Sequence, residues 1–216
     1  MLKETDKIFI AIPCMDMVAA GFAQSLATLN KKGLCAISFL CGSLIYDARN
    51  RLSAQSMMSE SQYTMWFDSD MVFEPDVMLK LFDTMDKTGA DIVSGLYFRR
   101  AAPYTPVAFS HFDVDEEGKA HFEHYEGELT GTHEVDAVGF GCVLMKTQVL
   151  ADVFEKFEDC FSPIAQVGED LSFCWRAKQL GKKIVLDTDV KLGHVGHLIF
   201  GEDFYKIYLT NNKDGG

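Results

Sequence analysis

The chain has 216 residues, enough for one large domain with a sizeable buried core. Hydrophobic residues make up 48% of it and charged residues 24%, proportions that are ordinary for a globular protein and exclude a disordered one. The formal net charge of −12, without any Lys- and Arg-rich run, argues against a nucleic-acid polymer as partner, because binding to phosphates needs clustered cations.

No targeting or membrane segment is recognisable in the sequence. Residues 1–7 are charged and lead directly into a short apolar run, and no uncharged stretch reaches the roughly 18 residues that span a bilayer. The 6 cysteines are scattered and form no Cys-x-x-Cys pair, which indicates reduced, mostly buried thiols and no zinc site. We therefore expect a cytoplasmic protein with no membrane span.

Short apolar runs alternate with helical periodicity through the first half of the chain. This pattern is typical of βαβ units and predicts a mainly parallel sheet flanked by helices. Pro13 is expected to end the first strand, and Gly33 and Gly89 to end two helices. The predicted elements are a strand over 8–12, a helix from 18 to 32, a strand over 34–40, a helix over 47–59, a strand over 63–67, a helix from 74 to 88 and a strand over 91–97.

The second half changes character at about residue 99. Prolines, alternating apolar residues and polar turns over 99–138 predict short antiparallel strands and loops, which we interpret as an inserted substrate region. Gly139 and Gly141 put a bend in the strand-like run 135–145, but without a third glycine and a following helix they do not indicate a dinucleotide-binding fold. The remaining predicted elements are helices over 147–157 and 171–177 and strands over 183–186 and 190–192.

Asp68 and Asp70 follow the predicted strand 63–67, at the place where α/β proteins hold their ligands. Two acids one residue apart in an extended chain point the same way, so both can face one divalent cation or the phosphates that it carries. The same pair is common in solvated turns, and the other motifs of the chain decide between the two interpretations. Those motifs are Ala48-Arg49-Asn50, Gly168-Glu169-Asp170 at a helix start and His194-Val195-Gly196 at a strand end.

In this order the motifs resemble the glycosyltransferases of the GT-A fold, particularly the family 2-like group. Ile12-Pro13 at the end of the first strand and the segment 139–142 add to the resemblance, which covers roughly residues 8–196. The resemblance implies a single α/β GT-A domain with a small antiparallel element in its second half. The expected divisions are a domain over 1–210, with a nucleotide-binding half over 7–98 and an acceptor and catalytic half over 99–210, and a flexible tail over 211–216.

The resemblance also implies an enzyme of the hexosyltransferase type, which moves a sugar from a nucleoside-diphosphate sugar to an acceptor hydroxyl. The bond from the anomeric carbon to phosphate breaks with oxocarbenium character and leaves negative charge on the diphosphate. In such enzymes a divalent cation, usually Mn²⁺ or Mg²⁺, neutralises that charge as a Lewis acid. We therefore expect Mn²⁺ or Mg²⁺ as cofactor, a nucleoside-diphosphate sugar as donor, and a glycan, a protein or a small molecule as acceptor.

The resemblance gives each motif a role. Asp170 is expected to act as the base that takes the proton of the acceptor hydroxyl in an inverting enzyme, or Glu169 if the register is shifted. The expected metal ligands are Asp70, His194 and Asp68; Asp68 is more suited to the ribose or the metal's water shell, and His197 is an alternative to His194. The residues expected to hold the donor are Pro13, Asp16, Arg49, Asn50, Asp68 and Arg99, with Arg100 near the diphosphate or the acceptor.

Simpler structural explanations stay open for the same residues. Glu169 and Asp170 also suit a helix N-terminus electrostatically. Arg49 is equally compatible with an exposed helix face, and His194 with a hydrogen-bonded strand end.

Other functions stay open as well. The sequence does not decide between inversion and retention, and a non-catalytic module that binds nucleotide sugars or carbohydrates is a further alternative. A sugar-nucleotide pyrophosphorylase is disfavoured, because residues 12–16 lack its Gly-rich loop with Arg and Lys. Cys14 and Met15 replace the polar residues usual in the resembling family, so the nucleotide base is undetermined, as are the donor sugar, the acceptor and the oligomeric state.

Overall fold

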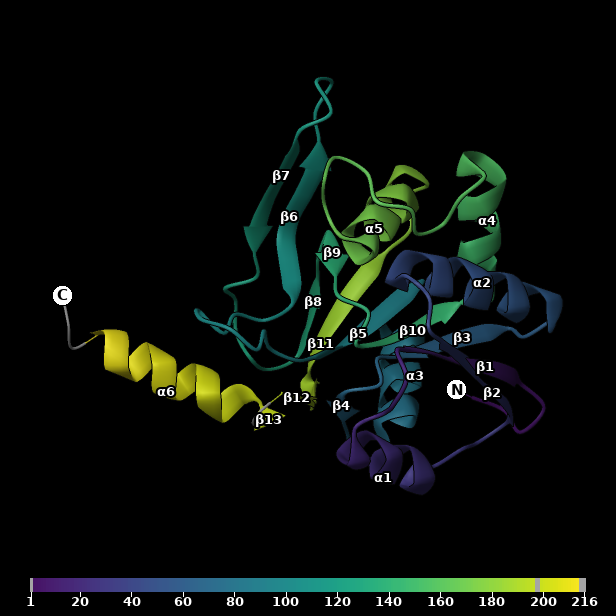
Figure 1. Cartoon of the computed structure of the whole chain (residues 1–216), viewed down its shortest axis with the longest axis horizontal. Coiled ribbons are helices and arrows are strands. Elements are labelled where there is room, and N and C mark those ends of the chain that lie inside the picture. Colours follow the sequence, from purple (N-terminus) through teal and green to yellow (C-terminus); the bar gives the residue numbers. More distant parts are fainter. Residues whose placement is uncertain (1, 197–198, 214–216) are drawn as a thin grey trace.

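The computed structural model describes residues 2–196 and 199–213, and within them the largest sheet has seven strands (Figure 1). Their order is β2-β1-β3-β10-β5-β11-β8. β1 runs parallel to β2 and β3, and β11 runs parallel to β5, whereas β10 and β8 are antiparallel to their neighbours. The prediction of a mainly parallel sheet is thus confirmed. The strands are β1 (Lys7–Cys14), β2 (Leu34–Cys41), β3 (Tyr63–Phe67), β5 (Ile92–Leu96), β8 (Thr132–Glu134), β10 (Cys142–Lys146) and β11 (Ile184–Lys191).

Two small antiparallel sheets accompany the large one in the described residues. In the first, β12 pairs with β13 on one side and with β4 on the other. In the second, β6 forms a hairpin with β7 and also pairs with β9. These are the antiparallel elements expected in the second half of the chain, although one of them also recruits β4. Their strands are β4 (Met71–Val72), β6 (Ala108–Val114), β7 (Ala120–His124), β9 (Ala137–Val138), β12 (Gly193–Val195) and β13 (Ile199–Phe200).

Helices cover both faces of the large sheet (Figure 1). Side chains of α2, α4 and α5 join the core on one face, and those of α1 and α3 join the core on the other. Alternate side chains of β3 enter the two cores, with Trp66 on the first face and Met65 and Phe67 on the second. Burial on both faces explains why this strand is a nearly continuous apolar run. The helices are α1 (Ala20–Thr28), α2 (Ile45–Met58), α3 (Val77–Thr88), α4 (Thr147–Phe157), α5 (Glu169–Gln179) and α6 (Glu202–Lys213).

Several strand boundaries differ from the predictions, and two of these differences have a structural explanation. β1 does not end at Pro13, which stays in register with Leu40 of β2. The missing N–H of this proline is tolerated because β3 pairs with β1 only as far as Ala11, so β1 has a single neighbouring strand at that point. The two strands predicted over 183–186 and 190–192 are one strand, β11, because its register with β5 shifts after Asp187 without breaking the pairing.

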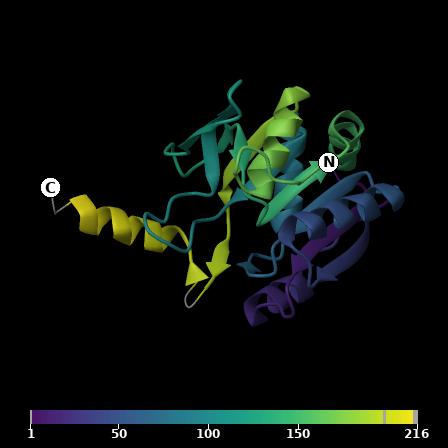
Figure 2. The same cartoon turned by 45° about the horizontal axis from the view of Figure 1, so that its top comes forward.

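α6 projects away from the sheets in both views (Figures 1 and 2). Tyr205 connects it to the body by stacking on Phe98, with ring centroids 5.3 Å apart. The helix extends to Lys213, so it takes in the first residues of the predicted tail 211–216, and residues 214–216 lie outside the described part of the chain. No helix in the described residues is long and apolar enough to cross a membrane.

Several loops that carry predicted site residues lie at one edge of the large sheet. The loops that leave β1, β3 and β5 lie there, and so does the loop that enters β10, because β10 runs opposite to β3 and β5. The backbone N–H of Asp68 donates a hydrogen bond to the carbonyl oxygen of Gly141 over 3.1 Å, which joins two of these loops. Ligands of α/β proteins bind outside the carboxyl ends of such strands.

Candidate active site

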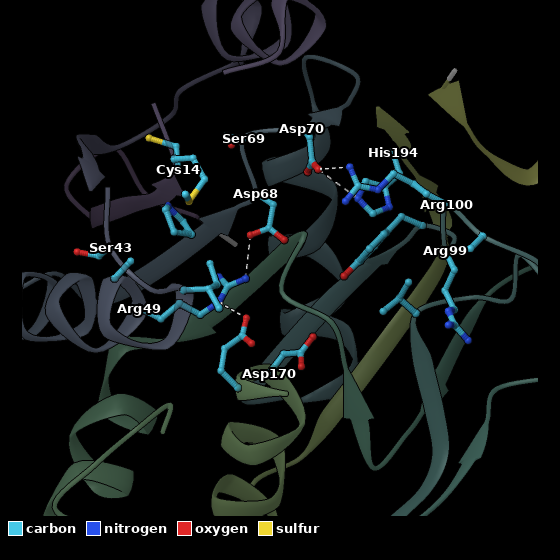
Figure 3. Close-up of a pocket in the computed structure, with 18 residues that line it drawn as sticks. Cys14, Ser43, Arg49, Asp68, Ser69, Asp70, Arg99, Arg100, Asp170 and His194 are labelled. Carbon is cyan, nitrogen blue, oxygen red and sulfur yellow. Dashed lines mark hydrogen bonds and ion pairs between the residues drawn. The ribbon is translucent and has the colours of Figure 1, made fainter. Parts of the chain in front are cut away.

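A cavity of about 590 Å³ opens at this edge of the large sheet (Figure 3). Its walls come from the ends of β1, β3 and β5, the first turns of α2 and α5, and β12. Segments that are distant in the sequence therefore meet around one space. Of the predicted site residues, those lining the cavity are Pro13, Arg49, Asp68, Asp70, Arg99, Glu169, Asp170 and His194.

Three predicted residues are not placed in this cavity. Asp16 is exposed and does not line it. Asn50 faces away from it: its side-chain amide donates to Asp159 over 3.3 Å and accepts from the backbone N–H of Phe161 over 2.9 Å. The role of Asn50 in the structure is therefore to tie α2 to the loop after α4. His197, the alternative to the first histidine of its motif, lies outside the described residues.

Arg49 is a buried cation that joins the loop after β3 to the start of α5. Its side chain is 2% exposed, which excludes the exposed helix face considered from the sequence. Nη2 donates to Oδ1 of Asp68 over 2.8 Å, and Nε donates to Oε1 of Glu169 over 3.1 Å. The residue after β3 and the first residue of α5 are thereby held at a fixed separation.

Aromatic rings surround the guanidinium of Arg49. Its Cζ atom lies 5.2 Å from the ring centroid of Phe140, 5.6 Å from that of Trp66 and 6.0 Å from that of Phe161. These distances permit cation–π attraction where water is excluded. Burial alone would lower the pKa of Arg49, but the neighbouring carboxylates, Asp68 first among them, raise it above its ordinary value. The charge at this position is permanent.

The segment Gly139-Phe140-Gly141 is explained by its neighbours and not by a nucleotide. A Cβ atom on Gly141 would lie 2.8 Å from Cζ of Tyr97, and one on Gly139 would overlap the Tyr97 hydroxyl. The backbone N–H of Gly141 donates to that hydroxyl over 3.1 Å. The two glycines thus admit the ring of Tyr97 on one side, while Phe140 packs against Arg49 on the other.

Asp70 carries a different set of partners from Asp68 (Figure 3). Nη1 of Arg100 donates to Oδ2 of Asp70 over 2.8 Å and to the carbonyl oxygen of Val195 over 2.9 Å. Nε2 of His194 lies 3.4 Å from the same Oδ2. Burial would raise the pKa of Asp70, but the contact with His194 and the charge of Arg100 outweigh it and lower that pKa. Asp70 is therefore ionised near neutral pH.

His194 is oriented as a metal ligand would be. Its Nδ1 lies 3.0 Å from the carbonyl oxygen of Phe98, which can only accept, so Nδ1 carries a proton. With Nδ1 so held, Nε2 is the ring atom that can donate to Asp70 when protonated, or bind a cation shared with Asp70 when not, and a hydrogen-bonded Nδ1 is the second-layer arrangement typical of metal-binding histidines. The ring also packs edge-on against Tyr97, with centroids 5.5 Å apart.

Asp70 and His194 together suit Mn²⁺ as ligands, because a carboxylate oxygen and an imidazole nitrogen are both among the groups that usually bind this ion. Asp68 fits that set less well, since its Oδ1 is already paired with Arg49. No group of three or more His, Cys, Asp or Glu side chains in the described residues is arranged to hold a metal ion. A cation at Asp70 would therefore need further ligands from a bound phosphate and from water.

As in the pair of acids after β3, one of the two acids at the start of α5 is bound to Arg49 and the other is not. Glu169 is 15% exposed and is held by Arg49. Asp170 lines the cavity, and its pKa is raised to about 6, first by burial and then by the charge of Glu169. A carboxylate with that pKa is mostly ionised at pH 7 and is still a useful proton acceptor. Asp170 is thus the better placed of the two as a base.

The sequence predicts no role for Tyr97 or Phe140, and for Arg100 it predicts only a position near the diphosphate or the acceptor. The sequence signal for Phe140 is its position between two glycines inside the strand-like run 135–145, and that for Tyr97 is its position at the end of the predicted strand 91–97. No local signal identifies the partner of Arg100, because Asp70 lies on a different loop.

The model of glycosyl transferase family 2 matches residues 46–154, which include Arg49, Asp68 and Asp70 but end before Asp170 and His194. Among solved structures, A197 from STIV is similar with a TM-score of 0.64 at 19% identity, over 89% of this chain and 86% of that one. GalNAc-T7, crystallised with UDP, GalNAc and Mn²⁺, has a TM-score of 0.60 at 10% identity, over 89% of this chain and 44% of that one. This chain therefore spans less than half of that protein. No curated protein matches the sequence.

Replacing Arg49 with Met should lower the free energy of unfolding by about 3 kcal/mol, because Asp68 and Glu169 lose the cation between them. Urea unfolding followed by tryptophan fluorescence measures this loss, since Trp66 lies against the guanidinium. Arg51→Ala on the same helix is the control: Arg51 is 59% exposed, and the substitution removes a surface ion pair with Asp47 and a hydrogen bond to Ser43. Equal effects of the two substitutions would contradict the assignment.

Proposed function

Because this chain belongs to glycosyl transferase family 2 and has a GT-A-like α/β fold, we propose that it transfers a sugar from a nucleoside-diphosphate sugar to an acceptor hydroxyl with inversion. The observation that carries the proposal is the single cavity with Asp70 and His194 on one side and Asp170 on the other. A metal-held diphosphate and a base belong on opposite sides of the anomeric carbon in such a reaction. In this proposal residues 7–98 form most of the donor site, and residues 99–210 supply the base, the acceptor site and, for the donor, Arg99, Arg100 and His194, all within one domain.

The nucleotide is proposed to lie at the end of the cavity formed by β1 and α2. Pro13, Cys14, Ser43 and Ile45 line that end, outside the carboxyl end of a parallel strand. Arg99 and Arg100 line the opposite wall and supply positive charge to a diphosphate, in a chain whose net charge of −12 would otherwise repel it. That GalNAc-T7 was crystallised with UDP and Mn²⁺ supports the same class of ligand here.

Asp70 and His194 are proposed to hold Mn²⁺ or Mg²⁺. When bound, the cation would neutralise charge on the departing diphosphate as a Lewis acid. Asp68 has a separate role, because it keeps Arg49 paired and leaves its second carboxylate oxygen for the ribose. Arg100 must first release Oδ2 of Asp70, and it is long and exposed enough to do so, with 47% of its side chain accessible.

Asp170 is proposed to accept the proton of the attacking hydroxyl. Its position in the first turn of α5 favours the ionised form, which opposes the effect of burial. Glu169 is held by Arg49 at the start of that turn. It is therefore disfavoured as the base in place of Asp170. The hydroxyl must lie about 3 Å from Asp170 for the proton to transfer.

A second cavity, of about 360 Å³, is the proposed acceptor site. It shares Arg99 and Val107 with the first cavity, and Gly168 on its wall immediately precedes the two acids of α5. Phe122, which is 50% exposed, lies on it together with the aromatic side chains of β6 and β7. An exposed aromatic face suits the C–H surface of a sugar ring, so the proposed acceptor is a carbohydrate or a small glycoside.

The function is tested by screening nucleoside-diphosphate sugars, with and without Mn²⁺, for thermal stabilisation and then for product. A donor at 100 times its dissociation constant should add about 2.7 kcal/mol of stability.

Asp170→Asn should bind that donor as well as the parent does and lose at least about 100-fold in turnover, because the general base is gone. For the parent, kcat/KM should rise with pH and level off above pH 6, since Asp170 must be ionised and its pKa is about 6.

Glu169→Gln is the matched control for Asp170→Asn. It should cost stability through Arg49 but retain most of the turnover. Full turnover of Asp170→Asn refutes the base assignment. Donor binding without any product from the parent identifies a non-catalytic module, and retention in the product by NMR refutes the inverting mechanism.

The metal site is tested with Mn²⁺ alone, by electron paramagnetic resonance titration. Asp70→Asn and His194→Ala should each weaken Mn²⁺ binding at least tenfold, because each removes a ligand. Arg100→Ala should strengthen it, because the guanidinium that occupies Asp70 is gone. Asp76→Asn, which removes a half-exposed acid paired with Lys80 on α3, should change nothing. Unchanged binding in Asp70→Asn would refute the site.

The acceptor site is tested with methyl hexosides by saturation-transfer NMR in the presence of UDP and Mn²⁺. Phe122→Ala should weaken binding about tenfold, since an aromatic contact of this kind contributes about 1 kcal/mol or slightly more. Phe154→Ala is the control, because Phe154 is 51% exposed but lies on α4, outside both cavities of the proposed site. Equal affinities of the two variants would exclude Phe122 from the acceptor site.

A further inference from the structure

Two cysteines face each other at the ends of neighbouring strands. Cys14, the last residue of β1, is in register with Cys41, the last residue of β2. Their Sγ atoms are 3.1 Å apart, and both residues are free thiols. Cys41 is exposed to solvent, whereas Cys14 is half-buried and lines the large cavity.

We propose that Cys14 and Cys41 form a reversible disulfide that weakens nucleotide binding in the cavity. The first part of this proposal concerns the two thiols alone. The second part rests on the proposed function, because it assumes that a nucleotide occupies the end of the cavity where Cys14 lies.

The geometry favours bond formation without rearrangement of the sheet. The sulfur atoms need to approach by about 1 Å to reach the bonding distance of about 2.05 Å. The strand ends are already joined, because the backbone N–H of Gly42 lies 3.3 Å from the carbonyl oxygen of Cys14 and 3.1 Å from that of Met15. The other four cysteines have no such arrangement: Cys35 is at the opposite end of β2, and the rest are buried in the cores.

The chemistry requires an oxidant, and a small disulfide such as oxidised glutathione supplies it. The thiolate of Cys41 attacks one sulfur of the reagent, which releases one glutathione thiolate and leaves a mixed disulfide. The thiolate of Cys14 then attacks the Cys41 sulfur, forms the Cys14–Cys41 bond and releases the second glutathione. The two cysteines lose two protons and two electrons, and the reagent becomes two thiols. Cys41 reacts first because it is exposed, and because burial raises the pKa of Cys14 to about 11.

The effect on the cavity follows from what the two strand ends carry. Met15 directly follows Cys14, while Ser43 and Ile45 follow Cys41, and all three line the cavity. A nucleotide at this end lies between the two loops. A covalent bond at their base fixes the spacing of the loops, and so removes the adjustment that the seating of a nucleotide requires. Bound nucleotide must disfavour the disulfide by the same factor, because such coupling is reciprocal.

The experiment incubates the full chain with oxidised glutathione and follows its intact mass. The parent should lose about 2 Da and resist alkylation at Cys14 and Cys41, and dithiothreitol should reverse both changes. Cys35→Ser should behave like the parent. Cys41→Ser should keep its mass or stop at a glutathione adduct, and Cys14→Ser should stop at that adduct on Cys41. Failure of the parent and of Cys35→Ser to form the bond would overturn the proposal.

UDP with Mn²⁺, the ligands crystallised with GalNAc-T7, is the probe for the second part. Its dissociation constant should rise about tenfold on oxidation of the parent, return with dithiothreitol, and stay constant in Cys41→Ser. An unchanged constant in the oxidised parent refutes the coupling but not the disulfide. If the reduced protein binds no nucleoside diphosphate, the proposed function fails, while the mass measurement still decides whether the disulfide forms.

Discussion

The arrangement of this cavity depends on one buried charge. Arg49 cannot be removed from water without acidic partners, because an unpaired guanidinium in the core would cost several kcal/mol. Its partners come from two distant segments, Asp68 after β3 and Glu169 at the start of α5. The ion pairs therefore fix the distance between the two sides of the cavity. The rings of Trp66 and Phe140 keep water away and make those ion pairs stronger.

Arg49 binds only one acid of each pair, so the two acids of a pair have different surroundings. All four acids line the cavity, but Asp68 and Glu169 are paired with Arg49, so Asp70 and Asp170 are the two that Arg49 does not hold. Their environments differ in a useful way. His194 and Arg100 keep the pKa of Asp70 low, which would suit the proposed cation ligand, whereas burial and the nearby Glu169 raise that of Asp170 to about 6, which would suit the proposed base. Carboxylates with separated pKa values are the usual mark of distinct roles.

The sequence predicts most of the fold because the spacing of apolar residues along a helix or strand indicates which of its sides is buried. The helix predicted over 147–157 has the bounds of α4, and the two acids do follow β3. Burial of Arg49 was not predictable, since a charged residue on a polar helix has the same local pattern whether it is exposed or enclosed by rings from three other segments. The same holds for Asn50, whose partners belong to the loop after α4. Local pattern carries no information on contacts between distant segments.

In the proposed function, Arg100 would help the site of an acidic protein to accept an anion. Alone, Asp70 would repel a diphosphate, and Arg100 cancels that repulsion by an ion pair at 2.8 Å. If the proposed cation took its place on Asp70, Arg100 would be available beside Arg99, and both arginines line the cavity. With a divalent cation, the exchange would raise the local charge at Asp70 by one unit and also free a guanidinium for the diphosphate. Binding of the proposed cation and of the diphosphate would then be coupled through one side chain, and the strength of that coupling would depend on how easily Arg100 leaves Val195 as well as Asp70.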